Sequence, residues 1–178
     1  MRKEQKRNIK YLKREEWEEL RASIDNVRDK LIIGLLYATG MRVGELCLVR
    51  TEDIDFEEHF ISIPWQNTKT KTARTVYVPQ ETLSDIKAYL KLTKRKGGVL
   101  IHLSKRRLQQ LVKKYSDISG VKCSAHTLRH SHIVHALLDK VPITAVQKQV
   151  GHKLLTTTQV YSDLAPEQVR EAYQRREK

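Results

Sequence analysis

The chain has 178 residues, enough to bury the core of one sizeable domain but not comfortably of two. It carries 34 Lys and Arg against 21 Asp and Glu, a formal net charge of +13. That excess favours a polyanionic partner, nucleic acid first, over an anionic membrane. A basic protein without a specific partner is the alternative.

Several features indicate a cytoplasmic protein. No apolar run approaches the roughly 18 residues that span a membrane. The charged start of the chain, MRKEQKRNIK, lacks the apolar stretch of a signal peptide. The two cysteines, Cys47 and Cys123, provide no disulfide framework, which fits a reducing compartment.

The first third of the chain is predicted to be helical. After a basic lead-in, residues 1–10, apolar residues recur at helical intervals from Trp17 to Leu35. The run LIIGLLYA (31–38) indicates a buried helix, which Thr39-Gly40 interrupts. A second helix is expected to begin near Arg42.

The period of the pattern then changes from helical to two. FISIPW (60–65) and ARTVYVP (73–79) alternate apolar and polar residues, which predicts an antiparallel hairpin with Trp65 on the same face as the isoleucines. The connecting loop, NTKTKT, carries Lys69 and Lys71 at or near its tip.

Helical spacing returns from Leu83 to Leu90, and the run VLI (99–101) is expected to add a third strand. Ser104 is expected to cap a further helix. One face of that helix is apolar, and the other carries four basic side chains: Lys105, Arg106, Lys113 and Lys114. Such a face is typical of a helix against DNA and equally of a solvated surface.

The last third predicts four short helices. The first spans about 125–139, and Thr144 is expected to cap the second. A third would contain Tyr161, because Thr156 and Gln159 have capping-box spacing, and a fourth would begin at Pro166. The core stripe of the first of these helices is expected to consist of Val134, Leu137, Leu138 and Val141.

Three motifs carry side chains suited to phosphate chemistry. Arg42 opens a helix after a Thr-Gly turn, where a guanidinium can grip two phosphate oxygens while Glu45 orients it. His126 and Arg129 are three residues apart and share a helix face. Alternatively, Arg42 and Glu45 form an ordinary surface pair, and the histidine and arginine lie on a solvated polar face.

The third motif, VGHKLLTTTQVY (150–161), places His152 in a turn nine residues before Tyr161. Taken alone, Tyr161 fits a half-buried packing role better than a chemical one. A metal site is a further alternative for the crowded residues that include His126, but their spacing matches no zinc pattern. The other members of that group are Cys123, His130, His132 and His135.

In combination, the motifs ATGMRVGEL, TKTKTARTVYVP, HTLRH, VGH and TTQVYSDL occur in the order found in tyrosine recombinases. The chain resembles the integrase and Xer-like group of that family from about Tyr11 to Tyr173. The resemblance implies a mainly α fold with a small antiparallel β-sheet. Residues 11–178 would form the catalytic domain, and the N-terminal core-binding domain of the family would be absent from this chain.

The resemblance also implies roles for the site residues. Tyr161 is similar to the nucleophile that forms a 3′-phosphotyrosyl bond, and Arg42 and Arg129 to the arginines that bind the non-bridging oxygens. Lys69 is similar to the lysine that protonates the leaving 5′-oxygen, with Lys71 as the alternative.

His126 and His152 resemble the paired histidines that bond the phosphate and assist proton transfer, and Glu45 resembles the acid that supports Arg42. No cofactor or metal is implied. No catalytic role is implied for the remaining histidines of the crowded group: His130, His132 and His135.

The implied function is site-specific recombination of double-stranded DNA, by a homo-tetramer on DNA that can be a monomer without it. The alternatives are type IB topoisomerase-like relaxation of DNA and a non-catalytic DNA-binding protein of the same fold. The helix past Pro166 is expected to dock on a neighbouring protomer or to fold back on its own domain. Its candidate contacts are Val169, Ala172 and Tyr173.

Overall fold

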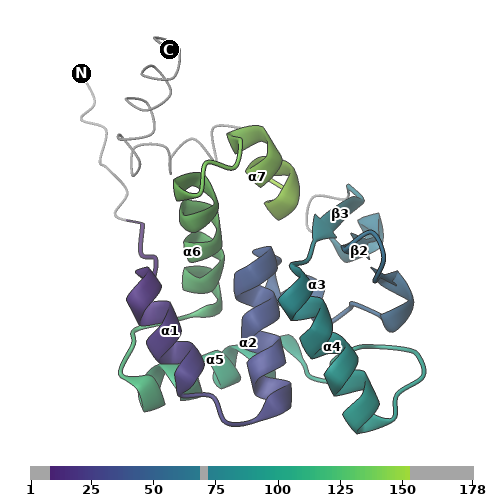
Figure 1. Cartoon of the computed structure of the whole chain (residues 1–178), viewed down its shortest axis with the longest axis horizontal. Helices are drawn as coiled ribbons and strands as arrows, with labels where there is room; N and C mark the ends of the chain where they lie inside the picture. The colour runs from purple at the N-terminus through teal and green to yellow at the C-terminus, as the bar shows by residue number, and fades with distance from the viewer. Residues whose placement is uncertain (1–8, 69–71, 153–178) are drawn as a thin grey trace.

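The computed structural model describes residues 9–68 and 72–152, and this part is mainly helical with one small antiparallel sheet, as predicted (Figure 1). Helix α2 runs through the middle, and α6 and α4 make its most extensive contacts. The α-helices are α1 (Arg14–Ala22), α2 (Val27–Thr39), α3 (Val43–Leu46), α4 (Gln80–Thr93), α5 (Lys105–Ser119), α6 (Ala125–Leu138) and α7 (Ile143–Val150).

The sheet has the order β1-β2-β3, with both neighbouring pairs antiparallel. Its strands are β1 (Ile54–Asp55), β2 (Phe60–Ile63) and β3 (Arg74–Tyr77), and two short 3-10 turns lie beside it, η1 (Thr51–Asp53) and η2 (Trp65–Asn67). Ile61 pairs with Val76, and both side chains are fully buried. The predicted hairpin is thus β2 and β3, while Lys69 and Lys71 lie outside the described residues.

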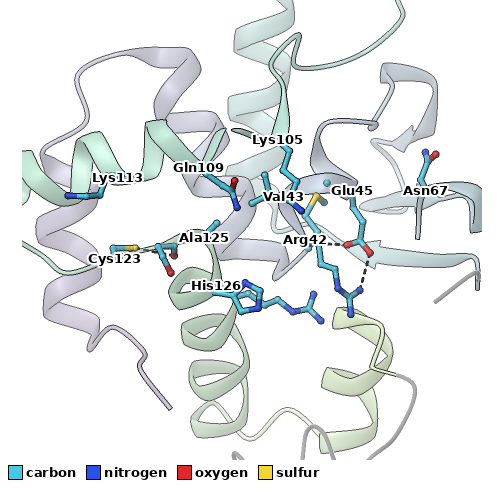
Figure 2. A pocket seen from close by; sticks show the side chains of 14 residues that line it. Arg42, Val43, Glu45, Asn67, Lys105, Gln109, Lys113, Cys123, Ala125 and His126 are labelled. Carbon is cyan, nitrogen blue, oxygen red and sulfur yellow. Dashed lines mark hydrogen bonds and ion pairs between the residues drawn. The ribbon is translucent and has the colours of Figure 1, made fainter. Parts of the chain in front are cut away.

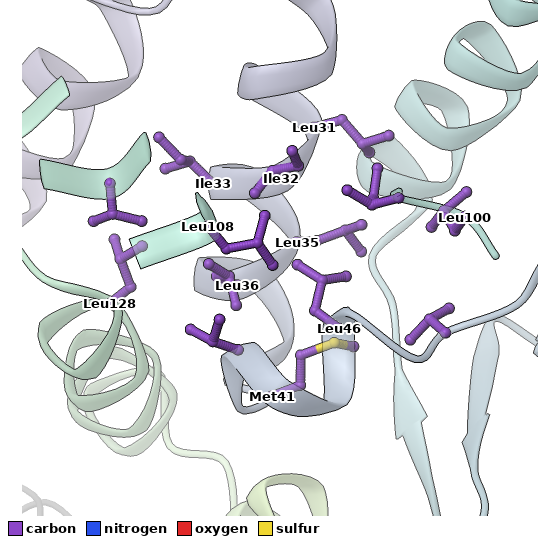
Figure 3. Packing of buried hydrophobic residues seen from close by; sticks show 14 of the residues in the cluster. Leu31, Ile32, Ile33, Leu35, Leu36, Met41, Leu46, Leu100, Leu108 and Leu128 are labelled. Atoms are coloured by element: carbon purple, nitrogen blue, oxygen red, sulfur yellow. The ribbon is translucent and has the colours of Figure 1, made fainter. Parts of the chain in front are cut away.

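Helix α2 forms the centre of the core because nearly every turn of it is apolar (Figure 3). It begins at Asn26, whose side chain accepts from the backbone N–H of Asp29, and ends at Gly40 with a φ of 62°. Figure 3 shows its leucines and isoleucines surrounded by Met41, Leu46 and leucines of later segments.

Two predictions about the sheet are wrong. The third strand is β1, not 99–101, where only Val99 forms an isolated bridge to Arg50. The neighbouring Leu100 is fully buried without joining the sheet. Trp65 is 52% exposed, because the chain turns into η2 after Pro64 and the strand alternation ends at Ile63.

Two predictions about the later helices also need correction. Helix α6 ends at Leu138, and the chain then turns through Lys140 with a φ of 65°. Leu138 and Val141 are therefore exposed instead of joining the core stripe. Helix α7 is capped at Pro142 rather than Thr144, two residues earlier than predicted.

A smaller apolar cluster fixes α7 against α6. It consists of Ile133, Val134, Leu137, Val146 and Val150. Because α7 ends at Gly151, this packing determines where the following residue, His152, stands. None of the helices in residues 9–68 and 72–152 has the length and apolar character needed to cross a membrane.

Candidate active site

A cleft of about 830 Å³ gathers most of the described candidate residues (Figure 2). Its walls come from the start of α3, the end of η2, one face of α5 and the first turns of α6. Figure 2 shows Arg42 and His126 extending from two different elements toward the same region. Six of the predicted residues line the cleft: Arg42, Glu45, Lys105, Lys113, His126 and Arg129.

The other predicted residues do not line the cleft or lie outside the described residues. His152 is described, does not line the cleft, and follows α7. Arg106 and Lys114 are described but do not line the cleft. Lys114 instead lies over the ring of Tyr115, 4.6 Å from its centroid. Lys69, Lys71 and Tyr161 lie outside the described residues, as do Pro166 and the residues that follow it.

Arg42 is the residue before α3, and Glu45 orients it. The backbone N–H of Arg42 donates to Glu45 Oε2 at 2.8 Å, and its Nη1 donates to Oε1 at 3.1 Å. Glu45 is only 2% exposed, whereas the Arg42 side chain is 28% exposed. The buried carboxylate therefore anchors an arginine whose guanidinium still reaches the cleft.

Arg129 is nearly buried, and backbone carbonyls fix it from two sides. Its Nη1 donates to the Gly40 carbonyl at 2.6 Å and its Nη2 to the Val150 carbonyl at 2.7 Å. Gly40 has no room for a side chain, because a Cβ there would lie 2.5 Å from the ring of His132. The ends of α2 and α7 thus orient Arg129.

Sequence reasoning missed a second arginine bound to Glu45. Arg74, at the start of β3, donates from Nη1 to Glu45 Oε1 at 3.0 Å and from Nη2 to Oε2 at 2.8 Å. Burial raises the pKa of Glu45, but the hydrogen bonds and charge of Arg74, with those of Arg42, lower it overall. Glu45 is therefore a carboxylate shared by two arginines.

Gln149 was also missed, and it joins α7 to β3 and α2. Its side-chain Oε1 accepts from the backbone N–H of Tyr77 at 2.9 Å, and its Nε2 donates to the Tyr77 carbonyl at 2.9 Å. The same Nε2 also donates to the Thr39 carbonyl at 3.3 Å. The amide therefore fixes the strand of Arg74 relative to the helix that precedes His152.

His152 stands in the field of the arginines. Its pKa is lowered to about 4 by burial, then by the positive charges of Arg129 and Arg42, with smaller contributions from His130 and Arg74. Gly151, just before it, has a φ of 68° and completes the turn. The ring is consequently uncharged near neutral pH, a form in which one ring nitrogen is a hydrogen-bond donor and the other an acceptor.

His126 differs from His152 because it is exposed, at the mouth of the cleft. Its ring meets the ring of His130 edge-on, with centroids 5.6 Å apart. Two imidazoles of different burial are thus available at the arginines, one from α6 and one from the turn after α7.

Of the remaining histidines, His135 has a packing role. His135 is buried, and its Nδ1 lies 2.7 Å from the hydroxyl of Tyr37, which stacks on Trp17. Burial raises the pKa of the Cys123 thiol to about 12. Across the described part of the chain, no three His, Cys, Asp or Glu residues are grouped in a way that could hold a metal ion.

The charges of the cleft do not balance. Arg42, Lys105, Lys113 and Arg129 line it, against one lining carboxylate, Glu45. Lys105 and Lys113 are eight residues apart on one face of α5. A groove of this charge can bind a phosphate and the DNA strand on either side of it.

Comparison with known proteins identifies relatives of the whole described region. The model of the phage integrase family matches residues 10–168. Tyrosine recombinase XerA of Pyrococcus furiosus is 36% identical over 160 residues, which cover 85% of this chain and 55% of the relative. XerA of Pyrococcus horikoshii is 35% identical over 176 residues, with coverages of 93% and 61%. The chain thus spans between half and two thirds of these relatives.

Solved structures share the fold. The crystal structure of XerA recombinase superposes with a TM-score of 0.80 at 24% identity, covering 93% of this chain and 64% of that one. XerH site-specific recombinase bound to its difH substrate before cleavage gives 0.73 at 24% identity, with coverages of 85% and 49%. At these identities the likeness concerns the fold.

Proposed function

Because the chain belongs to the phage integrase family, we propose that it is the part of a site-specific DNA recombinase that cuts and rejoins strands through a phosphotyrosine bond. Double-stranded DNA is its substrate, exchanged within a tetramer of chains on DNA, and a monomer is the free form. The Tn1549 transposon integrase, which shares the fold, was solved in complex with a circular intermediate DNA, which supports the choice of substrate. Its proposed localisation is the cytoplasm, in association with DNA.

One observation carries this proposal: Arg42 and Arg129, far apart in the sequence, line one cleft with a single carboxylate among its lining residues. A phosphodiester under attack gains negative charge on its non-bridging oxygens. Two fixed guanidiniums stabilise that charge more in the transition state than in the ground state. Both arginines are oriented before DNA arrives, by Glu45 and by two backbone carbonyls.

The cleavage step transfers the phosphoryl group from the 5′-oxygen of the DNA to the tyrosine. The phenolic oxygen of Tyr161 attacks phosphorus and forms the 3′-phosphotyrosyl bond, while the bond from phosphorus to the 5′-oxygen breaks. Lys69, or Lys71 in its place, gives a proton to that 5′-oxygen. Rejoining reverses the step with the 5′-hydroxyl of the exchanged strand, so no ATP and no metal enters the balance.

Histidines complete the proposed site. His152 is uncharged before DNA binds, because its pKa is about 4. It can bond a non-bridging oxygen, and His126 can assist removal of the phenol proton. Tyr161 follows His152 by nine residues, a length that spans at most about 30 Å.

The position of the proposed lysine loop agrees with this chemistry. Asn67 lines the cleft, and Lys69 follows two residues later. The backbone N–H of Thr72 donates to the hydroxyl of Thr68 at 3.0 Å, so the residues flanking 69–71 are joined. Residues 68 and 72 therefore lie together, next to the cleft-lining Asn67.

Trapping of a covalent adduct tests the proposal. The substrate is a pool of duplexes of random sequence, each with a nick that lets the 5′ fragment diffuse away after cleavage. We expect a protein–DNA adduct that survives denaturation and is lost in Tyr161→Phe, and sequencing of the trapped DNA identifies the site. DNA binding without any covalent adduct would contradict the proposal and indicate a DNA-binding protein that does not cleave.

A modified leaving group decides between the lysines. Lys69→Gln should slow cleavage of the trapped sequence by roughly 100-fold. Replacing the bridging 5′-oxygen with sulfur should restore the rate, because a thiolate leaves without a proton. Lys71→Gln is the matched variant. If the sulfur-containing substrate restored the cleavage rate of Lys71→Gln and not that of Lys69→Gln, the role would belong to Lys71.

A further inference from the structure

The carboxylate of Glu45 is the meeting point of two arginines, and their shares are unequal. Arg74 donates to both oxygens, at 3.0 and 2.8 Å. Arg42 uses one guanidinium nitrogen, at 3.1 Å, and its backbone N–H. The two-pronged pair with Arg74 is the stronger and more directional of the two interactions.

This asymmetry matters for the charge available to a phosphate. Glu45 is 2% exposed, so its negative charge is poorly screened and needs a partner. Arg74, with 10% exposure, supplies that partner from the side of the sheet. The guanidinium of Arg42 is therefore oriented by Glu45 without having to neutralise it alone.

Arg74 also contacts the turn that carries His152. Its Nε donates to the carbonyl of Gln149 at 3.2 Å. Its guanidinium covers Gly151 so closely that a Cβ at that position would lie 2.9 Å from Nε and Cζ. One side chain of β3 thus touches the support of Arg42 and the residue before His152.

We propose that Arg74 is a positioning residue of the active site, which neutralises Glu45 for Arg42 and fixes the turn of His152. This inference rests on the proposed function. Arg74 does not line the cleft, so it acts through these neighbours and not on the DNA itself. Its loss leaves Arg42 as the only described side chain that pairs with the buried carboxylate of Glu45, which draws the guanidinium of Arg42 away from phosphate.

Single-turnover cleavage of the trapped DNA sequence tests the inference. We expect Arg74→Gln to lower the rate constant at saturating DNA by roughly 10- to 100-fold, the usual cost of losing an outer partner. The DNA concentration at half-saturation should change less than about threefold. The rate constant of Arg74→Lys should lie between those of the wild type and Arg74→Gln, because lysine retains the positive charge but cannot donate two parallel hydrogen bonds to the carboxylate.

The double variant separates positioning from simple structural support. In Arg74→Gln only Arg42 compensates the carboxylate of Glu45. Adding Glu45→Gln releases the guanidinium of Arg42 from that pair and should raise the rate constant by about fivefold or more. A merely structural role for Arg74 predicts that the double variant is as slow as Arg74→Gln or slower. That result would overturn the inference, as would an Arg74→Gln rate within twofold of the wild type.

Two controls keep the result interpretable. Arg95 also bonds backbone carbonyls, those of Val99 and Leu100, but away from the cleft, so Arg95→Gln should cleave at the wild-type rate within twofold. Should Arg74→Gln unfold at the assay temperature, Arg74→Lys with and without Glu45→Gln decides in the same way. A wild-type chain that forms no adduct refutes the proposed function itself, whereas a normal wild type with normal Arg74 variants refutes this inference alone.

Discussion

Two clefts in this chain are both lined with arginines, yet only one has a charge excess. The cleft between α3, α5 and α6 sets four Lys and Arg against one carboxylate. A second cleft, of about 480 Å³, is lined by Arg14, Arg21 and Lys30 and by Glu81, Asp85 and Asp139. There Arg14 pairs with Asp139 at 2.5 Å, and Arg21 pairs with Glu81.

The comparison shows that an arginine in a cleft is not by itself a phosphate site. In the second cleft each of the two arginines has its own exposed carboxylate partner. In the first, two backbone carbonyls orient Arg129, and the lining residues include four Lys and Arg but one carboxylate. The balance of charge and the type of anchor therefore distinguish the two.

The largest expected difference is between one arginine from each cleft. Arg129→Gln should lower the single-turnover cleavage rate by roughly 100- to 1000-fold, as for loss of a group that stabilises transition-state charge. Arg21→Gln should change it less than twofold. Urea unfolding of both variants measures how far each loses stability. In Arg129→Gln, that loss reports the carbonyls of Gly40 and Val150 that no longer receive a hydrogen bond from Arg129. Equal losses of cleavage rate in Arg129→Gln and Arg21→Gln would contradict the functional difference between the two clefts.

The lysines of the two clefts should differ in their dependence on salt. Lys105→Gln and Lys113→Gln should each weaken DNA binding about 5- to 10-fold at 0.1 M salt and lower the slope of log K against log salt by about 1. Lys30→Gln, in the balanced cleft, should leave the slope unchanged. Gel-shift titrations at several salt concentrations measure this, and an equal slope change for Lys30 would contradict it.

Acid should destabilise the fold, through one histidine at each arginine-lined region. Burial, with a smaller contribution from the charge of Arg129, lowers the pKa of His132 to about 4, and burial with the charges of Arg129 and Arg42 lowers that of His152 to about 4. An unfolded histidine takes its proton near pH 6.5, so between pH 6.5 and 4 the unfolded chain binds more protons, and the free energy of unfolding falls as the pH falls.

We expect a loss of roughly 1 kcal/mol per histidine between pH 7 and pH 5, after allowance for solvent screening. Urea unfolding at the two pH values measures it. Bound DNA should raise the pKa of His152, which Arg129 and Arg42 both lower, more than that of His132, which Arg129 lowers without a contribution from Arg42. Ring-proton NMR titrations of the free and bound chain test this, and a parallel shift of both histidines would refute it.

The smallest effect is expected from unbalancing the second cleft. Glu81→Gln with Asp139→Asn leaves three basic side chains there against Asp85. Because both pairs are exposed, stability should fall by no more than about 1 kcal/mol. Non-specific DNA affinity at low salt should rise about twofold, with the cleavage rate unchanged. A larger gain would mean that net charge alone makes a DNA-binding cleft.

Local patterns predicted the elements that need only neighbouring residues. The hairpin, the buried helix α2 and the Ser104 cap of α5 all follow from signals within a few residues. Arg42 was placed at a helix start for the same reason, since Thr39-Gly40 ends one helix just before it. That Arg42, His126 and Arg129 line one cleft was an expectation of the family resemblance, because no local pattern brings α3 and α6 together.

What the sequence could not indicate depends on contacts between distant segments. Arg74 reaches Glu45 across 29 positions and the carbonyl of Gln149 across 75. Nothing in ARTVYVP distinguishes an arginine that binds a buried carboxylate from an exposed one. The third strand was misplaced because an apolar run such as 99–101 reports burial, and burial does not require a neighbouring strand.

The amide of Gln149 has a consequence for solubility. Strand β3 ends the sheet, and the backbone groups of Tyr77 that Gln149 binds are those that point away from β2. Left unbound, such a border invites a strand from another molecule and leads to aggregation. The side chain of Gln149 thus takes the hydrogen bonds that a further strand would make at Tyr77, an exposed aromatic residue of β3. It thereby blocks pairing of this edge with a strand of another molecule.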